Sequence, residues 1–112
     1  MTNRIQDLLK FLEESPGDPF LKFALTMEYK KAGDAAKALA GFQQLVAEHP
    51  DYVGTYYHYA KFVEGGGDKE QASAIYRQGM EVAQKLRNRH AYSELLGAYN
   101  LLRGDDDEDW DG

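Results

Sequence analysis

Residues 33–50 read GDAAKALAGFQQLVAEHP, and residues 67–84 read GDKEQASAIYRQGMEVAQ. The two segments begin 34 residues apart, and each has an alanine five residues after its glycine and an aromatic residue nine after it. A repeat of this length is typical of stacked helix–turn–helix units, none of which can bury a core alone. The repeat therefore favours a binding surface over a catalytic one.

The composition favours one folded domain. The chain has 112 residues, of which 43% are apolar and 29% are charged, and these are ordinary values for a globular protein. It has no cysteine, which excludes disulfides and thiolate metal sites and fits a reducing compartment. No apolar run approaches the roughly 20 residues needed to cross a bilayer. Residues 1–7 are amphipathic, unlike a signal peptide. We therefore expect a cytoplasmic protein that is not bound to a membrane.

The net charge of −6 comes from one end of the chain. Residues 105–111 carry six acids, and the remaining 13 acids match the 13 lysines and arginines. A neutral body argues against nucleic-acid binding, which needs a clustered basic surface. The charge density predicts an acidic disordered tail over residues 104–112, after a helical repeat domain over residues 1–103.

Apolar spacing and capping residues predict six helices. Asn3, Asp18, Asp34 and Asp68 have the short polar side chains that favour the N-cap position. Gly33 is expected to end a helix in the left-handed conformation. The predicted helices span about residues 3–14, 19–32, 34–48, 51–64, 68–86 and 89–102.

Together these residues resemble the tetratricopeptide repeat (TPR) family. One repeat would begin at Pro19, and its matching residues are Gly33-Asp34, Ala38, Phe42 and Pro50. A second would begin at Val53, and its matching residues are Ala60, Gly67-Asp68, Ala72 and Tyr76. Two positions depart from the pattern, namely Thr26 at position 8 of the first repeat and Gln84 at the closing proline of the second.

The resemblance covers about residues 3–102. It implies an all-α fold, a six-helix right-handed superhelix (solenoid) with two full repeats flanked by half-repeats. Independently of the resemblance, Ala38 and Ala72 are small where paired helices would cross. Phe42 and Tyr76 are large enough to fill the space between neighbouring pairs.

The resemblance also implies a function. TPR arrays bind extended or helical peptides in a concave groove lined by the first helix of each repeat, so we expect another protein or peptide as partner, no enzymatic activity and no cofactor. Carried over to this sequence, the groove residues are Phe23, Met27, Lys30, Lys31, Tyr57, His58 and Lys61. The third half-repeat would add Asn88, Ala91, Leu95, Ala98 and Tyr99. Apolar and aromatic side chains beside three lysines suit a peptide with apolar anchors and some acidic residues.

Three alternatives stay open from the sequence. Phe23 and Met27 could be buried under the first helix and serve only the core. Exposed aromatic residues at either end could serve self-association as a homodimer with no groove ligand. The acidic tail around Trp110 could dock in the groove of its own chain, dock in a second copy, or only aid solubility.

No motif predicts catalysis or metal binding. His90 and Glu94 lie four residues apart, a spacing that can supply two metal ligands on one helical face. No third ligand follows, so we predict an ion pair. The serines have no adjoining base that would activate them as nucleophiles.

Overall fold

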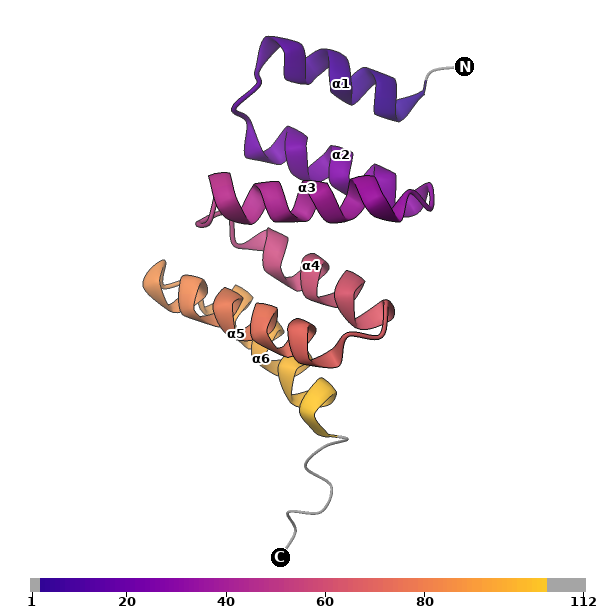
Figure 1. Ribbon diagram of the computed structural model, residues 1–112. Helices are drawn as coiled ribbons and strands as arrows, with labels where there is room; N and C mark the ends of the chain where they lie inside the picture. The colour runs from indigo at the N-terminus through magenta and orange to yellow at the C-terminus, as the bar shows by residue number, and fades with distance from the viewer. Residues whose placement is uncertain (1–2, 105–112) are drawn as a thin grey trace, which may run out of the picture. The chain divides into compact units, whose positions relative to one another are not determined.

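The computed structural model describes residues 3–104, and these form six helices and no strand (Figure 1). The helices are α1 (Arg4–Glu14), α2 (Pro19–Lys31), α3 (Ala35–Glu48), α4 (Gly54–Gly65), α5 (Lys69–Lys85) and α6 (Arg89–Gly104). The all-α class predicted from the sequence is confirmed. Helix α6 includes Gly104, one residue beyond the predicted domain boundary, and the rest of the predicted tail, residues 105–112, lies outside the described residues.

Contacts divide the chain into two compact units between Tyr52 and Val53. In the first unit, α2 packs against both α1 and α3. In the second, α5 packs against both α4 and α6, and α4 also contacts α6. The predicted packing residues Ala38, Phe42, Ala72 and Tyr76 are all fully buried.

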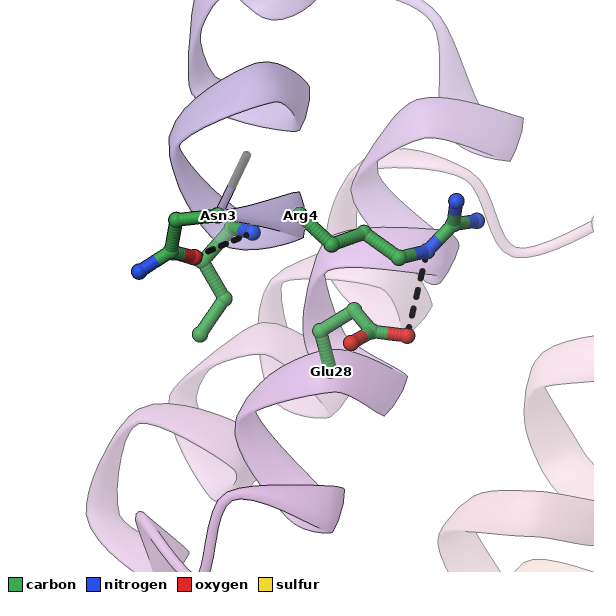
Figure 2. Close-up of polar contacts among 4 residues, drawn as sticks. Asn3, Arg4 and Glu28 are labelled. Carbon is green, nitrogen blue, oxygen red and sulfur yellow. Dashed lines mark hydrogen bonds and ion pairs between the residues drawn. The ribbon is translucent and has the colours of Figure 1, made fainter. Parts of the chain in front are cut away.

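The four predicted N-cap side chains each accept a hydrogen bond from a backbone N–H of the first turn. Asn3 Oδ1 accepts from Ile5 N at 2.9 Å, and Figure 2 shows this side chain folded back on the start of α1. The other three caps are Asp18 for α2, Asp34 for α3 and Asp68 for α5. Each bond satisfies a donor that the helix itself leaves unpaired, and such a cap contributes about 1 kcal/mol.

Three turns share one geometry. Gly33 and Gly67 have φ values of 82° and 95°, as expected for glycines that end a helix, and Arg87 adopts the same region with φ 57°. In each turn the next residue donates its N–H to a carbonyl five residues back, as Asn88 does to Ala83 at 2.8 Å. The sequence predicts a break at Arg87-Asn88, but it gives no sign that an arginine would take the left-handed position.

The predicted start of α4 at Asp51 is wrong, because the helix begins at Gly54. Residues 50–53 instead form a turn, in which the Tyr52 N–H bonds to the His49 carbonyl at 3.0 Å. Val53 is the N-cap of α4 and has no side chain that could accept a hydrogen bond. The turn after Pro50 places Asp51 outside the helix.

One ion pair ties α1 to α2 in the first unit. Arg4 Nε lies 3.2 Å from Glu28 Oε2, with the Arg4 side chain 67% exposed (Figure 2). A pair exposed to this degree contributes at most about 1 kcal/mol. Burial of Leu8 on the same helix therefore matters more for holding α1 in place.

Candidate functional site

A group of aromatic and cationic side chains lies on α4 of the second unit. This group, called here the α4 surface, consists of Tyr57, His58 and Lys61, three of the residues predicted to bind a peptide. The Lys61 Nζ atom lies 5.8 Å from the centre of the Tyr57 ring, within the range of a cation–π interaction. The two residues are four apart, so they share one face of the helix. The His58 ring meets the Tyr57 ring edge to face, with centroids 5.4 Å apart.

Tyr57 rests on a buried neighbour from α5. The Tyr76 ring packs edge to face with Tyr57 at a centroid distance of 6.5 Å, and its hydroxyl donates to Glu64 Oε1 at 3.2 Å. Burial raises the pKa of the Tyr76 hydroxyl, and the nearby Glu64 carboxylate raises it further. Tyr76 is therefore a neutral, hydrogen-bonded support that limits how far the Tyr57 ring can move.

The Lys61 ammonium is not neutralised by any carboxylate of the residues that the structure describes. The closest acid along its helix, Glu64, accepts the hydrogen bond from Tyr76 instead. Lys61 and Tyr57 are both half-buried, so water still reaches them. The α4 surface thus combines an accessible aromatic ring with a positive charge that a carboxylate of a ligand could pair with.

The other four predicted residues lie on α2 of the first unit and are called here the α2 surface: Phe23, Met27, Lys30 and Lys31. Phe23 and Met27 are half-buried, so both keep part of their side chains in contact with water. The Phe23 ring packs on Tyr52 with centroids 5.8 Å apart, and burial raises the pKa of the Tyr52 hydroxyl, with Asp18 adding to the effect. Lys30 and Lys31 are exposed in the last turn of α2, where a positive charge also stabilises the helix end.

The structure thus yields two candidate surfaces, one in each unit. Residues 23–31 belong to the first unit and residues 57–61 to the second. Each surface pairs apolar or aromatic side chains with lysines, the combination that the sequence predicts.

The additional groove residues expected from the third half-repeat are wrong in two cases, Leu95 and Ala98, whereas Asn88 is exposed. Leu95 is 1% exposed and Ala98 is 7% exposed, so both belong to the core of the second unit. The Asn88 side chain accepts a hydrogen bond from Ala91 N at 3.0 Å and caps α6. The repeat pattern places these residues on the first helix of a unit, but it cannot show which face α5 covers.

The predicted pairing of His90 with Glu94 is confirmed in its geometry, with 3.6 Å between Nε2 and Oε2. Within residues 3–104 no group of three or more histidine, aspartate or glutamate side chains could hold a metal ion. The sequence did not predict a cavity of about 530 Å³ at the α5–α6 turn. It is lined by Arg87, Asn88, Arg89 and Tyr92 among others, so Asn88 is the one predicted groove residue that contributes to it.

Comparison with known proteins identifies the family. The sequence profile described as Tetratricopeptide repeat matches residues 29–99, more than half of the chain. The chain belongs to the tetratricopeptide repeat family. TPR domains generally mediate protein interactions, so the fold suggests a protein–protein interaction module. No helix among the described residues of this TPR protein is both long and apolar enough to span a membrane.

Individual relatives support the TPR assignment. The chain is 29% identical to the TPR repeat-containing protein PA0015 of Pseudomonas aeruginosa, over 81% of this chain and 87% of that protein. A TPR domain protein from Salinibacter ruber, solved by NMR, matches with a TM-score of 0.77 and 43% identity, over 80% of this chain and 90% of that one. A Bordetella parapertussis protein solved in solution has a TM-score of 0.82 over 97% of this chain and 95% of its own, and at 21% identity it supports the fold alone. These similarities confirm the predicted TPR-like helical-repeat fold.

Proposed function

We propose that this protein binds an extended or helical peptide segment of a partner protein, and that the α4 surface is the main contact. The preferred peptide carries an aromatic or apolar anchor next to acidic residues. The α2 surface offers the same chemistry in the first unit and serves as a second contact for this class of peptide. We place the interaction in the cytoplasm, which the absence of cysteine favours.

The pairing of Lys61 with the Tyr57 ring is the observation that carries this proposal. A cation–π contact at a site open to water contributes about 0.5–1 kcal/mol, so a ligand carboxylate can compete for the ammonium at little cost. An aromatic anchor of the ligand would pack on Tyr57, whose ring is held by Tyr76. The ring and the charge lie side by side, and this arrangement favours a peptide in which the two matching groups are adjacent.

The α2 surface supports the same preference through different residues. Phe23 and Met27 lie four residues apart, so both reach the same face of α2 and offer a half-buried apolar strip. Lys30 and Lys31 follow in the last turn, exposed and without a carboxylate partner among the described residues. The apolar strip would take the anchor of a peptide, and the lysines would pair with its acids.

A random peptide library selected on the immobilised full-length chain tests the proposal. We expect enrichment of peptides with an aromatic residue adjacent to aspartate or glutamate. Selection on the Lys61→Gln variant should lose the acidic preference, whereas selection on Lys85→Gln, an equal change of charge on α5, should retain it. Enrichment of basic peptides, or the same enrichment on Lys61→Gln as on the wild type, would contradict the proposal.

Self-association is the second candidate, and exposed apolar side chains favour it. Leu101 is 78% exposed on α6, and Phe20 and Phe11 are 62% and 53% exposed in the first unit. Such residues can pair two copies of a chain. Sedimentation velocity over a wide concentration range distinguishes the candidates, since a sedimentation coefficient that stays at the monomer value removes this one.

A further inference from the structure

We propose that the acidic C-terminal segment, residues 105–112, docks on the α4 surface of its own chain and competes there with partner peptides. The inference deepens the proposed function and rests on it, because it assigns the same surface an internal ligand. The docked segment would act as a pseudo-ligand that raises the partner concentration needed for binding.

The chemistry of this segment matches the ligand that the α4 surface prefers. Residues 105–111 hold six acids around Trp110, which is the single tryptophan of the chain. An aromatic side chain next to carboxylates is the combination that Tyr57 and Lys61 would recognise. Lys61 has no carboxylate partner among the described residues, so its ammonium can pair with the acids of this segment.

Residues 105–112 follow the C-terminal end of α6, and this end lies at the same end of the second unit as the C-terminal end of α4. The Arg103 Nη1 atom, in the last turn of α6, lies 3.9 Å from Glu70 Oε1 in the first turn of α5. Helix α5 starts three residues after Gly66, directly behind the C-terminal end of α4. The C-terminal ends of α4 and α6 therefore lie at the same end of this unit, and the two helices contact each other.

The length of the segment is sufficient for docking. Lys61 precedes the last residue of α4 by four positions, which is about 6 Å along the helix axis. Helices in contact lie about 8–10 Å apart. Trp110 follows Gly104 by six residues, and six extended residues span roughly 20 Å. The tryptophan can therefore reach Tyr57 and Lys61 without unwinding α6.

Docking within one chain needs little intrinsic affinity. A ligand joined to its site by a short stretch of the same chain has an effective concentration of the order of millimolar, so even a contact of millimolar affinity would be populated. A partner peptide must displace this segment, and its apparent affinity falls accordingly.

Fluorescence of Trp110 in the full-length chain tests the proposal without any added ligand. We expect emission at shorter wavelength than that of a free peptide copy of residues 104–112. This shift should be lost at high salt and in the Lys61→Gln and Tyr57→Ala variants, and retained in Lys85→Gln. Circular dichroism of each variant verifies that the helices remain folded.

Two fluorescence results would overturn the proposal. The first is emission of the wild type equal to that of the free peptide. The second is emission that changes on dilution, since that indicates docking on a second copy.

Peptide selection on the Trp110→Ala chain distinguishes failure of the docking proposal from failure of the proposed function. If acidic-aromatic peptides still bind while Trp110 reports no docking, the proposed function stands and this inference fails. If Trp110 docks but no peptide is enriched even from Trp110→Ala, the proposed function and the competition with partner peptides both fail, and only the internal contact remains.

Discussion

Gly41 on α3 lies directly against the Thr26 side chain of α2. A Cβ atom added to Gly41 on α3 would lie 2.2 Å from Thr26 Oγ1 on α2, far inside van der Waals contact. The Thr26 hydroxyl is fixed, since it donates to the Lys22 carbonyl at 2.8 Å and the residue is 2% exposed. The unusual threonine at position 8 of the first repeat is therefore accommodated by a glycine on the facing helix.

Because of this contact, the effect of Gly41→Ala on stability should depend on the residue at position 26. Gly41→Ala should lower the free energy of unfolding by about 1–3 kcal/mol, because the added methyl group overpacks the contact. In a Thr26→Ala background the same change should cost less, because the hydroxyl and Cγ2 of residue 26 are gone, although its Cβ atom still lies 3.0 Å from the added methyl group. Urea denaturation of the four proteins gives the coupling energy. An equal cost of Gly41→Ala in both backgrounds would show that the threonine is not the obstacle.

Alanine substitutions at two glycines around the α4–α5 turn should differ in their effect on stability. Gly67 has φ 95° and open space around its Cα, so Gly67→Ala should cost about 1 kcal/mol through the backbone conformation alone. Gly65 lies in the last turn of α4, also with open space, so Gly65→Ala should be neutral or slightly stabilising. Thermal unfolding of the two variants is the measurement. Similar effects at both positions would mean that the left-handed turn is not required.

Tyr76 predicts a loss of stability in alkaline solution. Burial and the adjacent Glu64 raise the pKa of its hydroxyl above the value in the unfolded chain, which is about 10. The contribution is fully present below that pH and is lost as the pH rises toward the folded pKa. The free energy of unfolding should therefore fall above about pH 10, and it should fall less steeply in Tyr76→Phe. Parallel pH profiles for the two proteins would contradict this assignment.

Local signals explain which helices could be predicted. Asp34 and Asp68 each follow a glycine, and glycine then aspartate mark the end of one helix and the start of the next. Helix α4, which begins at Gly54, has no such signal, because Val53 cannot cap it and Asp51 lies in the preceding turn. The start of α4 depends on where the chain leaves the turn after Pro50, and the sequence does not specify that point.

Only part of the candidate site could be predicted from the sequence, because the repeat register does not show how neighbouring helices pack. The repeat register identified Tyr57 and Lys61 as residues on one face of one helix. It could not show that Tyr76 would support the Tyr57 ring, since that contact depends on how α5 packs on α4. For the same reason it misassigned Leu95 and Ala98, which α6 turns toward the core.

The most direct measurement of the central claim is an NMR titration of the full-length chain with a peptide that carries one aromatic residue flanked by aspartates. The largest amide shift changes should fall on α4 around Tyr57 and Lys61. Lys61→Gln should weaken the affinity about fivefold, because an ion pair at a half-exposed site contributes about 1 kcal/mol. Lys85→Gln should leave the affinity unchanged. Shift changes confined to the cavity at the α5–α6 turn, with equal affinities for both variants, would contradict the claim that the α4 surface binds the partner.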